Sequence, residues 1–221
     1  MSVASTSKSL RNPLSSNEGV STIELAVLLP VFMSVAMYGI EIANMASANM
    51  QASQLATSVA DNASRLGQTD NSAVTPTVTE AGIDSVMVGA IRQGRALRNF
   101  EANGRIILSS LERHPDEDVQ WIHWQRCAGD FEHASAYGND STENGVNGNE
   151  ITGLGRFGRI AAPAGDAVMF VEVYYNYTGI FGDMFVSPTI MRQEAAFIVR
   201  DDRDLMQDGD GVSGTGGSSQ C

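Results

Sequence analysis

Near its N-terminus the chain reads Gly19-Val20-Ser21-Thr22-Ile23-Glu24-Leu25 and then continues as an apolar run to Ile40. Counted from Ile23 to Ile42, this segment has twenty residues, and a helix of that length spans roughly 30 Å, the thickness of the hydrocarbon core of a bilayer. An acidic side chain at the bilayer centre costs about 2.5–3.5 kcal/mol on insertion scales, so an acid kept there indicates a function. The sequence therefore predicts a membrane helix in which Glu24 has a role.

The basic residues on either side of this segment predict its orientation. Lys8 and Arg11 precede the segment, whereas the first basic residue after it is Arg65. Positively charged flanks stay in the cytoplasm, so we expect a cytoplasmic N-terminus, a single membrane pass and export of everything that follows. Residues 1–19 are polar and lack a fold-forming pattern, and we interpret them as a leader peptide.

Charge and cysteine content limit the functions of the exported part. The chain has a formal net charge of −12, and most of the acids follow the apolar run. Such a surface repels phosphate backbones, which argues against nucleic-acid binding. The two cysteines, Cys127 and Cys221, both lie in the exported part, where oxidising conditions favour a disulfide. A bridge closing so long a loop stabilises a fold by about 4–5 kcal/mol in the chain-entropy model.

Hydrophobic periodicity predicts an α+β fold. Apolar residues at spacings of three and four continue past the membrane segment, so we expect one transmembrane and stem helix over 20–66. A capping box at Thr77 predicts a second helix reaching about Asn99. Short β-type runs then predict four strands, in the simplest case an antiparallel meander packed against the helices. The expected strands are 105–111, 119–127, 168–177 and 193–200. In the third of these the alternate residues Met169, Val171, Val173, Tyr175 and Tyr177 fall on one face.

These elements place an exported head at 67–205, between the stem helix and a Gly/Asp/Ser-rich tail at 206–221. A long insertion at 129–165 is rich in glycine and polar residues, and we expect a surface loop that builds no core. The tail contains Asp208-Gly209-Asp210-Gly211, which is similar to part of a calcium-binding loop, but the full loop with its terminal glutamate is absent. Calcium binding by the tail stays open.

From Glu18 to Phe32 the order of glycine, glutamate, apolar run and Pro30 resembles the TadE-like pseudopilin family of tight-adherence (Flp, type IVc) pilus systems in bacteria. The resemblance implies a pilin-like fold and cleavage between Gly19 and Val20 by a prepilin peptidase. It also implies that Glu24 meets the new amine of Val20 on a neighbouring subunit during assembly. The implied partners are other pilin and pseudopilin subunits, the inner-membrane assembly platform and membrane lipid. The implied location is the bacterial inner membrane with a periplasmic head, and after assembly an extracellular pilus.

Other functions remain as alternatives. The chain could be an uncleaved single-pass tether or binding module in the periplasm, or a secreted domain released after Ala48 by an ordinary signal peptidase. No nucleophile–base–acid set and no standard zinc spacing is visible in the sequence, so we predict neither an enzyme nor a resident metal or cofactor.

Overall fold

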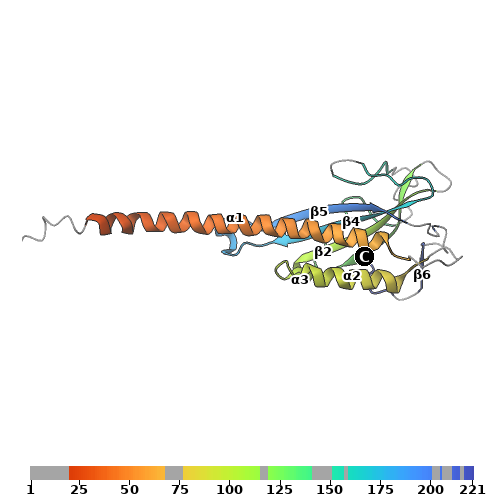
Figure 1. The fold of residues 1–221 in the computed structure, drawn as a ribbon, viewed down its shortest axis with the longest axis horizontal. Helices are drawn as coiled ribbons and strands as arrows, with labels where there is room; N and C mark the ends of the chain where they lie inside the picture. Colours follow the sequence, from red (N-terminus) through yellow and green to blue (C-terminus); the bar gives the residue numbers. More distant parts are fainter. Residues whose placement is uncertain are drawn as a thin grey trace, which may run out of the picture.

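The computed structural model describes residues 20–67, 77–114, 119–140, 151–156, 159–200, 205, 211–214 and 217–221. Its dominant element is the helix α1 (Val20–Ser64), whose 45 residues correspond to a length of about 67 Å. Figure 1 shows that the N-terminal half of α1 projects away from a head that packs along its C-terminal half. Pro30 lies inside the helix, as predicted, and the helix continues through it.

The head contains helices and an antiparallel sheet, so the predicted α+β class is confirmed. After α1 the described residues form a short strand, two helices and four longer strands, with a 3-10 turn before the last of these and a final two-residue strand. In order they are β1 (Val78–Thr79), α2 (Glu80–Gly94), α3 (Phe100–Asn103), β2 (Gly104–Arg113), β3 (Gln120–Ala128), β4 (Ala167–Tyr177), η3 (Gly182–Met184), β5 (Thr189–Ile198) and β6 (Val212–Ser213).

The strand order differs from the predicted meander. The four strands lie in the order β3-β2-β4-β5, so β4 pairs with β2 and not with β3. A meander needs short connections, but the chain between β3 and β4 is long enough to pass around the sheet and return beside β2. This arrangement puts β4, whose residues are buried except for Asn176, in the interior of the sheet, and leaves β3 at an edge.

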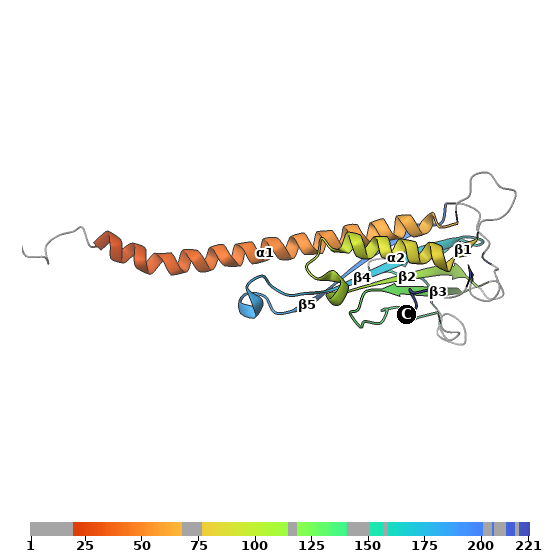
Figure 2. The ribbon, with the colours of Figure 1, turned by 90° about the horizontal axis from the view of Figure 1, so that it is seen from below.

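Both long helices cover the same face of this sheet (Figure 2). The main core lies between them and that face, and the alternate residues of β4 that point into it are the ones predicted from the sequence: Met169, Val171, Val173, Tyr175 and Tyr177. On α1 the buried residues follow the predicted stripe, with Ala48, Ala52, Leu55, Val59 and Ala63 all in the core. Helical and strand periodicity therefore identified the core correctly.

The second helix starts later and ends earlier than predicted. Its N-cap is Thr79, whose hydroxyl accepts a hydrogen bond from the Gly82 amide at 3.1 Å, and not Thr77. It ends at Gly94, and the ring of Phe100 occupies the space beside that glycine, where a Cβ would lie 2.4 Å from the ring. A turn and α3 follow in place of the continuous helix to Asn99.

The insertion at 129–165 contributes to the core, contrary to the prediction. Its described apolar residues cover the other face of the sheet and form a second, smaller hydrophobic cluster, because the few apolar side chains of the loop converge on one patch of β2, β3 and β4. The loop residues are Tyr137, Ile151, Leu154 and Ala162, and the strand residues are Leu111, Ile122, Val168 and Phe170.

Candidate functional site

The N-terminal half of α1 is uncovered on every side. Residues 21–36 are all exposed, and most are large and apolar. The side chains concerned include Ile23, Leu25, Val27, Leu28, Leu29, Val31, Phe32, Met33 and Val35. A soluble protein rarely exposes a continuous apolar surface of this size, so it marks a membrane or protein contact. The helix is long and apolar enough to cross a membrane once.

Glu24 lies within the first turns of this helix and is exposed. Among the described residues, none forms a hydrogen bond or an ion pair with its carboxylate. The helix begins at Val20, one turn before Glu24, so positions 20 and 24 share one helix face. Gly19 and the rest of the predicted leader lie outside the described residues, as does the side chain of Val20, so cleavage after Gly19 stays a prediction.

The bare half of α1 ends at a second acid, Glu41, which is fully buried. Its carboxylate accepts a hydrogen bond from the Tyr177 hydroxyl at 2.6 Å, and from the backbone amides of Ile180 and Phe181, each at 3.2 Å. Burial, and then the bond to Glu41, raise the pKa of Tyr177, so its hydroxyl stays protonated and donates. Glu41 therefore attaches the helix to the head.

Sequence reasoning missed this role of Glu41, which is the second acid of the segment from Ile23 to Ile42. The signal was present, because an acid inside an apolar run needs a partner. The partner lies 136 residues further along the chain, so the sequence alone does not identify it.

Beyond Glu41 the helix presents small residues to the head. Ala52, Ala56, Ala60 and Ala63 are completely buried, and their size lets the sheet and α2 approach the helix backbone closely. One helix therefore has two different surfaces: its second half is covered by its own head, whereas its first half is free for another partner.

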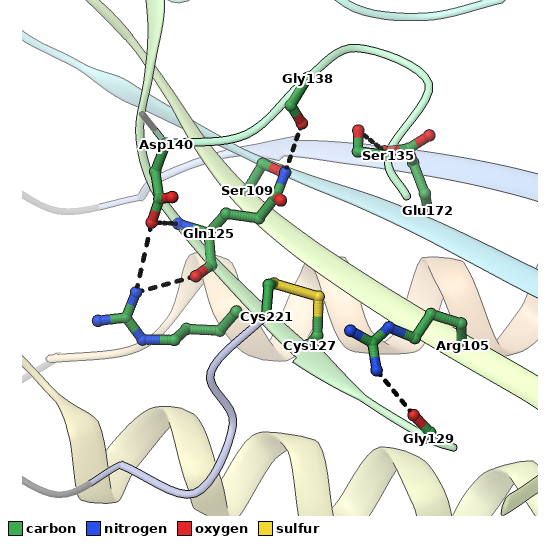
Figure 3. The surroundings of a disulfide bond; sticks show 11 residues. Arg105, Ser109, Gln125, Cys127, Gly129, Ser135, Gly138, Asp140, Glu172 and Cys221 are labelled. Atoms are coloured by element: carbon green, nitrogen blue, oxygen red, sulfur yellow. Dashed lines mark hydrogen bonds and ion pairs between the residues drawn. A yellow bond between two sulfur atoms is a disulfide. The ribbon is translucent and has the colours of Figure 1, made fainter. Parts of the chain in front are cut away.

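The predicted disulfide is present and joins β3 to the C-terminal residue. The Cα atoms of Cys127 and Cys221 are 4.9 Å apart, and 94 residues separate the two positions in the sequence. Figure 3 shows the bridge at the end of β3, with Gln125 and Arg105 on either side. The backbone amide of Cys127 also donates to the carbonyl of Ser219 at 2.6 Å, so the tail is held by its backbone as well.

Further contacts hold the last residues of the tail to the head. Asp84 of α2 accepts from the Ser218 amide at 3.0 Å and from the Ser219 hydroxyl at 2.6 Å, and these bonds lower the pKa of Asp84 below its usual value. Upstream, β6 pairs in parallel with β1, with Val212 opposite Val78. The described end of the predicted tail is therefore an integrated part of the head.

Within the parts of the chain that are described, no three or more His, Cys, Asp or Glu side chains come together in a way that could hold a metal ion. His123 contacts Glu112, with its Nδ1 atom 2.8 Å from Oε2. The calcium-like motif of the tail falls almost wholly outside the described residues, and calcium binding there stays an open prediction.

Comparison with known proteins identifies the helix and not the head. Residues 19–61 match the family model described as TadE-like protein. No curated protein and no solved structure matches the chain. The match begins at the glycine of the predicted cleavage site and ends three residues before the end of α1. The match agrees, over these residues, with the family that the sequence resembles, and the chain carries a TadE-like N-terminal helix on a head that this family match does not cover.

Proposed function

We propose that this chain is a non-catalytic minor pseudopilin that takes part in the assembly or tip structure of a bacterial Flp-type pilus. The family match suggests a protein associated with the tight-adherence pilus and with its other components. A single apolar helix near the N-terminus fits a membrane anchor, and the flanking Lys8 and Arg11 favour a cytoplasmic N-terminus with a periplasmic head.

One observation carries the proposal: the helix is covered along its second half and bare along its first. A helix that served only its own head would need no exposed apolar extension, whereas a subunit that moves from membrane to fibre needs a surface that fits lipid first and other helices later. The exposed residues 21–36 provide such a surface.

In this proposal Glu24 makes assembly specific. A prepilin peptidase cuts between Gly19 and Val20 and creates a positively charged amine. Glu24, which lacks a partner among the described residues, pairs with the Val20 amine of a neighbouring subunit. Each charge is unfavourable in lipid alone, and the two compensate each other only when subunits are in the correct register.

The mature N-terminus tests the processing step. Intact-mass analysis of the protein from its native host should show Val20 as the first residue. A chain that begins at Met1 would favour the alternative of an uncleaved tether or binding module, and one that begins at Asn49 would favour a secreted domain.

A pair of substitutions tests the role of the carboxylate. Glu24→Ala should leave cleavage largely intact but abolish incorporation into pili, whereas Glu24→Asp keeps the charge and should retain part of the incorporation. Both variants are compared with the unchanged protein by immunoblotting of sheared pili and of membranes. Normal incorporation of Glu24→Ala would remove the role proposed for Glu24.

A further inference from the structure

The connection between β4 and β5 lies against α1 where the bare half of the helix begins. Its backbone amides at Ile180 and Phe181 donate to Glu41, and the ring of Phe185 packs edge-on against Tyr38 with 6.1 Å between ring centroids. In Figures 1 and 2 this connection extends beyond the sheet, along α1 and toward its N-terminus.

The outer surface of this connection is apolar. Met184 is 72% exposed and Ile180 is 46% exposed, while the rings of Phe181 and Phe185 lie 6.0 Å apart and are half-buried. Asp183 is the only charged residue between positions 179 and 188. Apolar side chains held outward in this way, next to an apolar helix, form one continuous surface with it.

The length of α1 sets the depth of this surface in a bilayer. Fifteen helical steps separate Ile23 from Tyr38, a rise of about 22 Å, whereas the hydrocarbon core is about 30 Å thick. With Ile23 at the inner edge of that core, Tyr38 lies about 8 Å short of the outer edge. The connection packs at this level of the helix. Its exposed apolar residues must therefore lie in lipid, unless the whole helix is shifted outward along the membrane normal.

We infer that residues 179–188 insert into the outer leaflet of the membrane and form an apolar collar around the exit of α1. The inference rests on the proposed membrane anchor. Burial of Glu41 in the hydrogen bonds of the collar is consistent with it, because this acid of α1 is then not exposed to lipid, and Asp183 is left as the one exposed acid of the collar. The collar contains no basic residue, so its insertion does not need anionic lipid and is insensitive to salt.

Tryptophan scanning in vesicles tests the collar in the full chain. The protein is reconstituted in phosphatidylcholine vesicles with or without brominated acyl chains, which quench nearby tryptophans. Met184→Trp reports on the collar, Phe32→Trp reports on the anchor, and Ile198→Trp is the matched control at the far end of β5. All three positions are at least half exposed, so the substitutions do not disturb the core. The emission of the two native tryptophans is subtracted using the unchanged protein.

The expected result is loss of the added emission in Met184→Trp and Phe32→Trp but not in Ile198→Trp, with no effect of salt. Quenching at Phe32→Trp alone would overturn the collar and leave the anchor intact. If Phe32→Trp is not quenched, the anchor itself is wrong, and the collar with it. The emission of the tryptophan in Met184→Trp could instead be blue-shifted, unquenched by brominated lipid and dependent on the protein-to-lipid ratio. That result would show that a second copy of the chain covers this surface, and it would also overturn the inference.

Discussion

Reduction of the Cys127–Cys221 bridge should destabilise the whole head and not only the tail that it holds. The bridge closes a loop of 94 residues, and the loss of that restraint from the unfolded chain corresponds to about 4–5 kcal/mol. With a urea m-value of about 2 kcal/mol/M for a domain of this size, the unfolding midpoint should fall by about 2 M. The m-value should rise, because the unfolded chain becomes less compact when the bridge is opened.

The assay is urea unfolding of the full-length protein in detergent micelles, followed by the emission of Trp124, which is buried in the main core. Oxidised protein, protein kept reduced and a Cys127→Ser/Cys221→Ser variant are compared. Ser219→Ala is the matched control, because it removes the bond to Asp84 and leaves the bridge in place. We expect this control to lose only about 1 kcal/mol.

The alternative is that the bridge acts locally. Opening the bridge would then make the backbone amides of the tail accessible to hydrogen exchange, but it would leave the urea concentration at the midpoint of unfolding unchanged. A midpoint shift in reduced protein no larger than that of Ser219→Ala would refute the loop-closure reasoning.

Three further predictions concern the core, the helix–head junction and the tail. Leu55→Ala should lower the free energy of unfolding by about 2–5 kcal/mol because it leaves a cavity in the main core, whereas Met50→Ala, at an exposed position, should change it little in the same urea titration. Glu41→Gln removes the charged acceptor of the junction, so the amide of Ile180 should exchange hydrogen at least about tenfold faster; unchanged exchange would contradict the role of Glu41. Asp84 has a lowered pKa in the folded protein, so its contribution to stability is present above the unfolded value of about 3.9 and is lost as the pH falls through the lower folded value. The protection of the tail amides against hydrogen exchange, relative to the unfolded chain at the same pH, should therefore fall there, and Asp84→Asn should abolish that acid dependence.

Local patterns allowed most elements to be predicted because they depend on neighbouring residues. Spacings of three and four identified the buried stripe of α1, and alternation identified the inward face of β4. The end of α2 at Gly94 could not be predicted in this way, because apolar residues at helical spacing continue beyond it to Leu97. The order of strands could not be predicted either, since the long connection after β3 is compatible with pairing on either side of β2.

The sequence by itself determined the membrane-length helix, the resemblance of that helix to a family, the positions of Gly19 and Glu24, the α+β class and the pairing of the only two cysteines. These properties follow from composition, periodicity and spacing along a short segment, or from there being a single possible pair. Only the tertiary structure decided that Glu41 belongs to the head, that the insertion covers one face of the sheet and that the β4–β5 connection lies against α1 beside its exposed half. Each of these depends on groups that are distant in sequence and are brought together when the sheet closes against α1.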